Sequence, residues 1–228
     1  MELKKQAAEK ALDYIKDGMV LGLGSGSTTR IFIDLLGKKI QSGKLSNISG
    51  VPTSTTTAAQ SRAVGIPLTS LKEHPELDIA VDGADEVDPD LNLIKGMGGA
   101  LLREKIVETS ADIFLVIVDE SKVVPKLGIK NPVPVEIVQF EADATVKWLN
   151  SLGCDAILNH LDSGKPTQTD NNNYIAHCYF PEGITDAYKL ARVLSERPGI
   201  VEHGLFLNMA DVVIVAGIMG ISVLERKK

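Results

Sequence analysis

Short apolar segments alternate with segments of helical periodicity along the first half of the chain, and this rhythm limits the fold more than any other feature. Four apolar runs have the length of a strand, at residues 19–23, 47–51, 77–81 and 113–118. Four segments carry apolar residues at helical spacing, at residues 2–17, 31–36, 53–64 and 100–109. Apolar strands separated by helices form a parallel sheet with both faces covered. The sequence therefore predicts an α/β fold with a mostly parallel sheet.

The rhythm changes near residues 125–134, in the run VVPKLGIKNPVP, which reads as a proline-rich connection. Beyond it, strand and helix patterns follow in the order β-α-β-β-α-β, at residues 135–140, 142–152, 155–159, 174–180, 185–195 and 200–207. This order is typical of a ferredoxin-like α+β domain. A last apolar strand, at residues 211–215, is expected to return to the first sheet. We predict one domain from residues 1–130 and 206–228 and a smaller domain from residues 131–205.

Charge and composition argue against a general nucleic-acid-binding protein and against an integral membrane protein. The chain of 228 residues has a formal net charge of −6, whereas nucleic-acid-binding proteins usually show a basic face. No run approaches about eighteen apolar residues, and charges fill the N-terminal segment, so neither a membrane span nor a secretion signal is expected. A cytoplasmic protein is the simplest expectation, and earlier removal of an organellar transit peptide stays open.

The two cysteines give no sign of a metal site or a disulfide framework. Cys154 and Cys178 lie outside any CxxC pair, and no His/Cys cluster has the spacing of zinc ligands. We expect both to be buried, reduced thiols, and we predict no metal site in the chain.

A loop rich in glycine and serine follows the first predicted strand and leads into a helix, with the sequence LGLGSGSTT. Glycines let backbone amides approach a ligand closely, and a helix N-terminus favours an anion. Ser25, Ser27 and Thr28 add hydroxyl groups. The loop lacks the glycine spacing of a dinucleotide-binding loop and the Gly-Lys-Ser/Thr ending of a Walker A loop. It indicates a phosphate or polyol site, with a plain strand–helix turn as the alternative.

The apolar run at residues 77–81 leads into four carboxylates, in the sequence DGADEVD. Open α/β sheets bind their ligands at the carboxyl ends of parallel strands. Crowded carboxylates are costly unless cations, donors or a ligand compensate them. The alternatives are a solvated acidic loop and a metal site, although the order does not match a calcium loop of the EF-hand type. Asp82 and Asp85 are the better candidates, and Glu86 and Asp88 are expected to be solvated or to cap the chain.

A second glycine-rich loop opens with a lysine and leads into a helix, in the sequence KGMGGALLREK. Glu104 lies in the first turns of this helix and, taken alone, is typical of a surface glutamate that favours the helix dipole. Lys95 alone is equally ambiguous. Lys122, just after the apolar run that ends at residue 118, is by itself typical of a solvated lysine.

Each of these segments lies at or soon after the end of a predicted strand. Together they supply phosphate donors, two carboxylates, lysines and a separate glutamate. An aldose–ketose isomerase needs this set, since a base must move a proton between C2 and C1 while a cation or acid stabilises the enediolate oxygen. Triosephosphate isomerase meets a similar demand with a glutamate base. Such a reaction requires no nicotinamide, flavin or metal.

Four motifs in this order resemble the signature of the ribose-5-phosphate isomerase A family: GLGSGST, VDGADEVD, KGMGGALLREK and DESK. The resemblance extends to the tail GLFLNMADVVIVAG. It implies a Rossmann-like sheet domain with a smaller ferredoxin-like α+β domain, assembled as a homodimer or homotetramer. It also implies interconversion of ribose 5-phosphate and ribulose 5-phosphate in the non-oxidative branch of the pentose phosphate pathway, without a cofactor.

The resemblance further implies which residues form the site. Glu104 is the expected general base. Asp82, Asp85 and Lys95 are the other catalytic candidates. The expected substrate-binding residues are Ser25, Gly26, Ser27, Thr28, Asp82, Gly83, Ala84, Asp85, Lys95, Gly96, Met97, Gly98 and Lys122. Our hypothesis is that Asp82 opens the furanose ring or shuttles hydroxyl protons, Asp85 holds sugar hydroxyls, and Lys95 stabilises the enediolate.

The sequence departs from the family pattern at two positions. The family often has threonine where Ser25 stands, and the hydroxyl is kept. It often has glycine at Met97, where a side chain either narrows the loop or points away from it.

Two other functions stay open: a non-catalytic sugar-phosphate-sensing domain and an acyl-CoA transferase, because fold alone does not fix function. A transcriptional sensor would carry a helix-turn-helix, for which the first predicted helix leaves no room before the first strand. A CoA transferase would need a CoA site and usually a longer chain.

Overall fold

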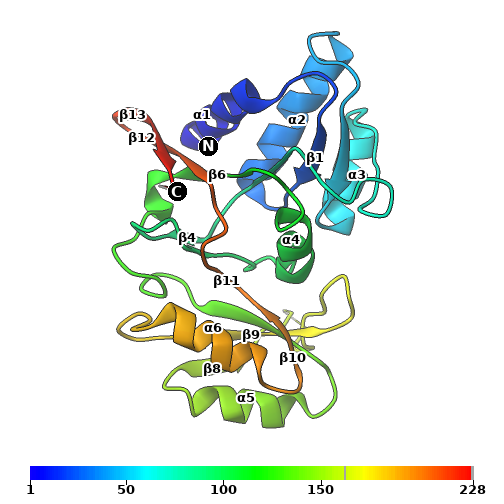
Figure 1. Cartoon of the computed structure of the whole chain (residues 1–228). Coiled ribbons are helices and arrows are strands. Elements are labelled where there is room, and N and C mark those ends of the chain that lie inside the picture. Colours follow the sequence, from blue (N-terminus) through cyan, green and yellow to red (C-terminus); the bar gives the residue numbers. More distant parts are fainter. Residues whose placement is uncertain (162, 227–228) are drawn as a thin grey trace. The chain divides into compact units, whose positions relative to one another are not determined.

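The computed structural model describes residues 1–161 and 163–226, and the chain divides into two compact units (Figure 1). Unit 1 comprises Met1–Ala84, Arg103–Lys122 and Met209–Lys228. Unit 2 comprises Asp85–Leu102 and Val123–Asn208. Each unit has a hydrophobic core of its own.

A six-stranded sheet forms the centre of unit 1. Its strands are β1 (Val20–Leu23), β2 (Ser49–Pro52), β3 (Ile79–Asp82), β6 (Phe114–Asp119), β12 (Val212–Gly217) and β13 (Gly220–Glu225). They lie in the order β13-β12-β6-β3-β1-β2, and only the β12–β13 hairpin is antiparallel. The predicted α/β fold with a mostly parallel sheet is confirmed, as is the return of residues 211–215 to this sheet.

Helices cover both faces of this sheet. They are α1 (Glu2–Ala11), α2 (Ser27–Gln41), α3 (Thr55–Ala63) and α4 (Leu101–Glu108), with single 3-10 turns η1 (Leu12–Tyr14) and η2 (Glu120–Lys122). α1 and α2 supply Ala8 and Phe32 to a core that includes Ile117 of β6. On the opposite face, Val107 of α4 packs with Val51 and Leu77. The helix predicted at residues 2–17 ends early, because the chain tightens into the 3-10 turn after Ala11.

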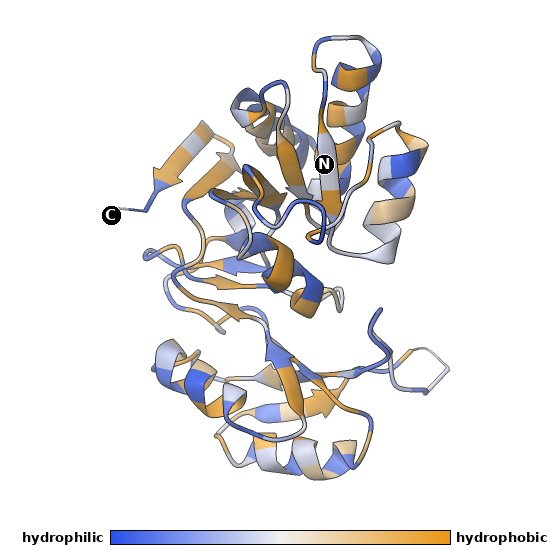
Figure 2. Cartoon of the chain, turned by 45° about the vertical axis from the view of Figure 1, so that its right-hand side comes forward, coloured by the Kyte–Doolittle hydropathy of each residue, from blue (hydrophilic) through white to orange (hydrophobic). Residues whose placement is uncertain are grey.

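Unit 2 is built on a four-stranded antiparallel sheet. Its elements are β7 (Val133–Ile137), α5 (Ala142–Asn150), β8 (Asp155–Leu158), β9 (Tyr174–Tyr179), α6 (Ala187–Ser195) and β10 (Ile200–His203). The strand order is β10-β7-β9-β8, so the two central strands are the first and third of the β-α-β-β-α-β series. This arrangement confirms the ferredoxin-like α+β fold. Hydropathy colouring shows apolar residues along the strands and on one side of each helix (Figure 2).

A small sheet of short strands was not predicted from the sequence. It consists of β4 (Glu86–Val87), β5 (Leu93–Ile94) and β11 (Leu205–Phe206), in the order β11-β5-β4. The single strand predicted at residues 200–207 is wrong, because the chain breaks at Gly204 into β10 and β11. A side chain at Gly204 would lie 2.2 Å from the carbonyl oxygen of Lys95, so the backbones approach too closely for any residue but glycine.

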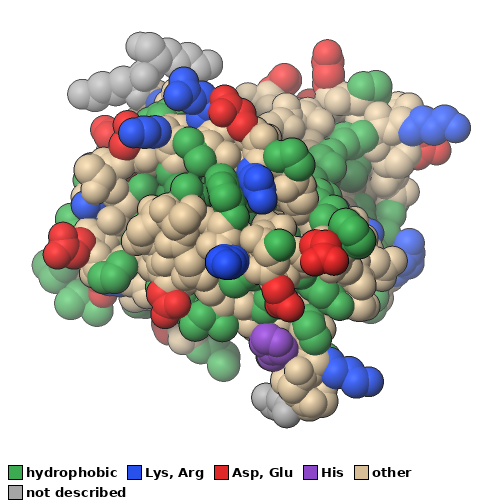
Figure 3. Space-filling model, turned by 90° about the horizontal axis from the view of Figure 1, so that it is seen from below, with side chains coloured by type: hydrophobic (Ala, Val, Ile, Leu, Met, Phe, Trp, Pro, Cys, Tyr) green, Lys and Arg blue, Asp and Glu red, His purple; other side chains and the backbone are tan. Residues whose placement is uncertain are grey.

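The predicted domain boundaries, residues 1–130 with 206–228 against 131–205, stay a prediction. Both cysteines are buried and free, as expected. Within the described residues, each helix is too short or too polar to cross a lipid bilayer. Acidic and basic side chains are interspersed on the face seen in Figure 3.

Candidate active site

The carboxyl ends of β1 and β3 lie side by side where the strand order of unit 1 changes direction. Leu23 of β1 pairs with Val81 of β3. β2 lies on one side of β1, and β3, β6 and β12 follow on the other. Open α/β sheets bind ligands at such a point. The first two predicted segments therefore meet where this topology favours a ligand.

Asp82, the last residue of β3, is fully buried and holds the loop that follows β1. Its Oδ1 accepts the backbone N–H of Ser25 at 2.9 Å and that of Gly83 at 2.7 Å. The hydroxyl of Thr29 donates to the same oxygen at 2.9 Å. A side chain at Gly24 would lie 2.1 Å from the carboxyl carbon of Asp82, so glycine is required there. The β1 loop and Asp82 thus form one hydrogen-bonded arrangement.

The Ser25 hydroxyl belongs to a cluster of four hydroxyl groups. It lies 2.8 Å from Thr53 Oγ1, 2.8 Å from Ser54 Oγ and 3.1 Å from Thr57 Oγ1. Thr57 also donates to the carbonyl of Gly24 at 2.8 Å, and Ser54 caps α3 by accepting the N–H of Thr57. The cluster ties the β1 loop to α3. The role of Ser25 in binding substrate stays a prediction.

α2 begins directly after this loop. Gly26 has φ +107°, a conformation that favours glycine, and the next two residues are Ser27 and Thr28. The first backbone N–H groups of a helix have no partner within it and favour an anion. Lys4 of α1 donates to the Ser27 hydroxyl at 2.8 Å and so brings a cation to this helix start. Lys4 carries no signal in the sequence, because the segment around it is charged throughout.

Glu104 and Glu108 lie one turn apart on α4, and both are buried, at 5% and 3% exposure. One carboxylate oxygen from each lies within 4.8 Å of the other and of a carboxylate oxygen of Asp82. The interpretation of Glu104 as a surface glutamate is therefore wrong. Glu108 was missed, although its spacing of four residues from Glu104 puts it on the same helix face. Three carboxylates at this spacing could share protons or hold a divalent cation.

Lys122 ends the 3-10 turn that follows β6 and is half-buried. Its neighbour Asp119, the last residue of β6, accepts the backbone N–H of Ser121 at 3.0 Å and also its hydroxyl. Burial alone would raise the pKa of Asp119, but the hydrogen bonds from Ser121 and the charges of Lys4 and Lys122 outweigh it and lower the pKa. Asp119 thus favours its ionised form, and the charge of Lys4, which donates to Ser27, contributes to that.

Lys95 is almost completely buried in unit 2, at 2% exposure. Its ammonium group lies 5.4 Å from the ring centroid of Phe206, and its backbone N–H donates to Gly204 at 2.9 Å. Gly96 follows with φ +98°, and a side chain there would collide with Leu101. Lys95, which was ambiguous from its local sequence alone, is therefore a buried lysine.

Asp85 and Met97 meet in unit 2. The backbone N–H of Met97 donates to Asp85 Oδ2 at 3.1 Å, and the backbone N–H of Asp85 donates to Ile94 at 2.8 Å. Only the backbone N–H of Met97 takes part in this contact, and every residue except proline has such a group. A methionine at this position is therefore compatible with the loop.

Glu86 and Asp88 have structural contacts, and the expectation that Glu86 is solvated is wrong. Glu86 is fully buried and accepts the backbone N–H groups of Gly128, Lys130 and Asn131, at 2.6–2.7 Å. Asp88 accepts backbone N–H groups two and four residues further on, and so organises its own turn.

The predicted site residues fall into two sets, one in each unit. Unit 1 holds Ser25, Gly26, Ser27, Thr28, Asp82, Gly83, Ala84, Glu104 and Lys122. Unit 2 holds Asp85, Lys95, Gly96, Met97 and Gly98. Within unit 1, the structure brings together Ser25, Asp82 and Glu104. Within unit 2, it joins Asp85 to the loop that Lys95 opens.

Comparison with known proteins decides the family. Residues 49–220 match the family described as ribose 5-phosphate isomerase A, or phosphoriboisomerase A. The chain belongs to the ribose 5-phosphate isomerase A family.

Relatives from plants and bacteria match over nearly the whole chain. A probable ribose-5-phosphate isomerase 3, chloroplastic, from Arabidopsis thaliana is 50% identical over 99% of this chain and 83% of its own length. A ribose-5-phosphate isomerase A from Desulfatibacillum aliphaticivorans is 50% identical over 96% of this chain and 95% of its own length.

Solved structures of the family share the fold throughout. A D-ribose-5-phosphate isomerase in complex with phospho-erythronic acid is 45% identical, with a TM-score of 0.95 over 99% of this chain and 98% of that one. The Plasmodium falciparum ribose 5-phosphate isomerase is 38% identical, with a TM-score of 0.96 over 100% of this chain and 99% of that one. Family membership therefore rests on both sequence and fold.

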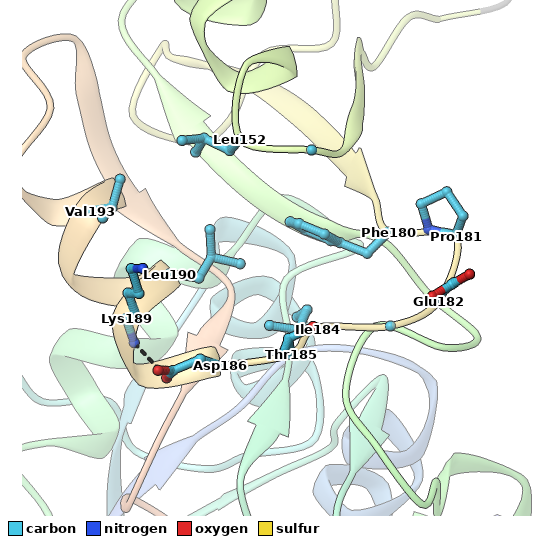
Figure 4. A pocket seen from close by; sticks show the side chains of 12 residues that line it. Leu152, Phe180, Pro181, Glu182, Ile184, Thr185, Asp186, Lys189, Leu190 and Val193 are labelled. Atoms are coloured by element: carbon cyan, nitrogen blue, oxygen red, sulfur yellow. Dashed lines mark hydrogen bonds between the residues drawn. The ribbon is translucent and has the colours of Figure 1, made fainter.

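Unit 2 also contains a separate pocket of about 690 Å³. Leu152, Phe180 and Leu190 form its apolar wall (Figure 4). At its rim, Asp186 caps α6 by accepting the N–H of Lys189 at 2.9 Å. None of the predicted site residues lines this pocket.

Proposed function

We propose that the chain interconverts D-ribose 5-phosphate and D-ribulose 5-phosphate by proton transfer through an enediol(ate), in the non-oxidative branch of the pentose phosphate pathway. The observation that carries the proposal is the buried carboxylate of Glu104 beside Asp82, at the ligand-binding edge of the sheet, in a member of this family. The sensor and CoA-transferase alternatives are not favoured, because the curated relatives are named as isomerases along the whole length of the chain.

Glu104 acts as the general base in this proposal. Its carboxylate removes the proton from C2 of the open-chain aldose and returns a proton to C1, which gives the ketose. Burial supports this role, because a carboxylate shielded from water and close to other carboxylates is a better base than an exposed one. Its neighbours Asp82 and Glu108 supply those negative charges.

Asp82 handles hydroxyl protons and assists opening of the furanose ring. Three donors hold its Oδ1, so the carboxylate is fixed in one orientation. Asp85 holds sugar hydroxyls, and the ammonium group of Lys95 stabilises the enediolate oxygen. The low exposure of Lys95 supports its part, since a cation acts more strongly on a nearby charge when water is excluded.

The phosphate binds at the start of α2, which Ser25, Gly26, Ser27 and Thr28 form. The helix N-terminus offers backbone donors to an anion, and Lys4 adds a positive charge next to Ser27. Lys122 is the further substrate-binding lysine in this proposal, and its charge, like that of Lys4, acts on Asp119.

The ligand of a similar structure agrees with this chemistry. Phospho-erythronic acid, present in the structure that is 45% identical, is a phosphorylated sugar acid with a planar carboxylate. A carboxylate at that end of the molecule resembles the planar, negatively charged enediolate, and molecules that resemble the reacting state bind tightly to a site built for it.

The proposal extends to assembly and location. We expect a homodimer or homotetramer that binds neither nucleic acid nor a membrane and works in the cytoplasm. One relative is named as chloroplastic, so location differs among members of the family.

Turnover of ribose 5-phosphate tests the function directly. The purified chain, with EDTA present, should convert ribose 5-phosphate to ribulose 5-phosphate, and in heavy water deuterium should appear at C1 of the ketose. Failure to convert this substrate would overturn the proposal. Activity that EDTA abolishes would contradict the prediction that no metal takes part.

A further inference from the structure

The hydroxyl cluster that ties the β1 loop to α3 is a chain of hydrogen bonds whose direction can be assigned, because each hydroxyl group has one hydrogen to donate. The chain ends at the carbonyl oxygen of Gly24, which can only accept, so the Thr57 hydroxyl donates to it at 2.8 Å. Thr57 Oγ1 is left as an acceptor, and the Ser54 hydroxyl donates to it at 3.0 Å. Ser54 Oγ in turn accepts the backbone N–H of Thr57 at 3.0 Å.

The Ser25 hydroxyl takes the next place in this chain. Because the Ser54 hydrogen is already used, Ser25 donates to Ser54 Oγ at 2.8 Å. The Thr53 hydroxyl then donates to Ser25 Oγ at 2.8 Å, and the longer contact of Ser25 with Thr57, 3.1 Å, carries no hydrogen of its own.

The opposite direction fits the cluster less well. It would bring the oxygens of Ser54 and Thr57 to 3.0 Å with no hydrogen between them. It would also leave the Thr53 hydrogen without an acceptor, since Ser25 is the one partner of that hydroxyl among the described residues. Only the direction from Thr53 to Gly24 uses all four hydroxyl hydrogens.

Burial makes this direction costly to reverse. Thr53 and Thr57 are 1% and 4% exposed, and Ser25 and Ser54 are half-buried. A buried hydroxyl group that loses its partner pays the full cost of desolvation, and hydrogen bonds in a row strengthen one another. The hydrogen of Ser25 is therefore committed to Ser54.

The two hydroxyl groups that follow on α2 differ from Ser25. Ser27 Oγ accepts from Lys4 at 2.8 Å, so its own hydrogen is available to another acceptor. The Thr28 hydroxyl makes no hydrogen bond with any residue that the structure describes. Ser27 and Thr28 can thus donate to an anion at the helix start without breaking an existing bond.

We propose that Ser25 and Thr57 are positioning residues, which hold the β1 loop through the hydroxyl chain, while Ser27 and Thr28 donate their hydroxyl hydrogens to the substrate phosphate. This division of roles rests on the proposed function, because it concerns the phosphate site of that reaction.

The chemistry of the phosphate supports the division. A phosphate dianion only accepts hydrogen bonds, and the Ser25 hydroxyl has no hydrogen to offer it. Ser25 instead fixes the loop from two sides, since its backbone N–H is bonded to Asp82 and its side chain to Ser54. A loop held in this way keeps the donors of the helix start in place before the ligand arrives, which lowers the cost of binding.

Thr57→Val tests the chain at its far end, because valine has a similar shape but neither donates to Gly24 nor accepts from Ser54. KM for ribose 5-phosphate should rise about tenfold, the scale of one or two lost hydrogen bonds. The variant should keep kcat close to the wild-type value, since Asp82 retains its bonds to Gly83 and Thr29. Thr57→Ser keeps the hydroxyl group and should restore KM.

Ser61→Ala is the matched control. Ser61 lies one turn further along α3 and is 0% exposed, and its hydroxyl has no hydrogen-bond partner within the described chain. Removal of this hydroxyl should leave both KM and kcat unchanged. If Thr57→Val fails to fold, Ser54→Gly takes its place, because glycine is tolerated at a helix N-cap and also interrupts the chain.

A double-mutant cycle separates positioning from direct contact with the phosphate. If Ser25 and Thr57 act through one chain, Ser25→Ala with Thr57→Val should raise KM by about the same factor as either change alone. If Ser25 donated directly to the phosphate, the two factors should multiply to roughly a hundredfold, and the positioning role of Ser25 would be overturned.

Binding of phospho-erythronic acid, measured by calorimetry, gives a readout without turnover, because this ligand has an acid group instead of an aldehyde. Its affinity should fall in Thr57→Val by the same factor as KM rises. A wild-type chain that does not convert ribose 5-phosphate would overturn the proposed function and this division of roles with it. An active wild-type chain whose Thr57→Val variant keeps both KM and ligand affinity would overturn the division of roles alone.

Discussion

Glu104 is the residue on which the proposed chemistry depends most. Glu104→Gln keeps the size and hydrogen-bonding capacity of the side chain but removes its basicity. We expect kcat to fall by at least ~10²-fold, the scale of a lost general base, with substrate binding kept. Steady-state kinetics and binding of a substrate analogue measure the two effects.

The matched control is Glu9→Gln, a half-exposed glutamate paired with Lys5 on α1, which should leave kcat unchanged. Near-wild-type turnover by Glu104→Gln would move the base to another residue.

Gly24 tests how closely the β1 loop must approach Asp82. In Gly24→Ala the new methyl group would lie 2.1–2.2 Å from the Asp82 carboxyl, so the carboxylate has to move. A displacement of about 1 Å at a catalytic group can lower the rate ~10²-fold, and we expect a loss of that order in kcat/KM.

Gly43→Ala is the control for this substitution, because the exposed Gly43 has φ +71° and no atom within 4 Å of the added methyl. It should lower Tm while leaving turnover unchanged. Full activity of Gly24→Ala would show that the position of Asp82 is not critical.

At the residue scale, the sequence predicts which side chains carry the chemistry better than it predicts which atoms those side chains contact. The carboxylates after β3 and the hydroxyls after β1 could be named, but not the bonds of Ser25 and Thr29 to Asp82, because those depend on how two loops meet. Glu104 has the local sequence of a surface helix residue, and its burial is a tertiary effect. The four-residue spacing of Glu108 from Glu104 predicts only that the two share a face of α4.

At the element scale, Glu86 stabilises the connection that leads into β7. Glu86→Gln replaces one acceptor oxygen by an amide donor that faces backbone N–H groups. Hydrogen bonds to a charged group contribute about 1.5–3 kcal/mol each, so we expect a loss of about 3 kcal/mol in the free energy of unfolding. Urea denaturation measures it.

Asp90→Asn provides the comparison for Glu86, since Asp90 is exposed a few residues away. It should change the free energy of unfolding by less than about 0.5 kcal/mol. Equal stability of the two variants would mean that water replaces the Glu86 contacts at no cost.

The long periodic elements could be predicted, and the short ones could not. β3 and β6 show their type because each is a continuous apolar run up to its final aspartate. β4, β5 and β11 have two residues each, too few for a period to appear. β13 escapes notice for another reason, because both of its faces are exposed and no alternation of burial marks it.

At the scale of the whole molecule, pairing between strands that are far apart in the sequence decides how the chain divides into units. The change of rhythm near residue 125 predicts a second fold type, and the β-α-β-β-α-β order is present. Unit 2 also takes in Asp85–Leu102, because β5 pairs with β11 more than 100 residues later, through Ile94 and Leu205. A partner so far along the chain leaves no trace in local periodicity.

The pH dependence of stability follows from His177, which lies on β9 and is 9% exposed. Burial lowers its pKa, and the charge of Asp85 offsets only part of that effect. As the pH falls below about 6.5, the unfolded chain therefore binds a proton that the folded chain takes up less readily. The free energy of unfolding must then decrease as the pH is lowered. The loss stops growing once the pH is below the folded pKa, where both states are protonated.

Urea denaturation between about pH 7.5 and 5.5 measures this contribution, because linkage relates the slope to the difference in bound protons. His177→Asn should flatten the fall in the free energy of unfolding. His74→Asn, at an exposed position in unit 1, should keep the wild-type slope. If both variants lose stability with acid as steeply as the wild-type chain, the acid sensitivity belongs to other groups, since a side chain that no longer titrates cannot contribute to the slope.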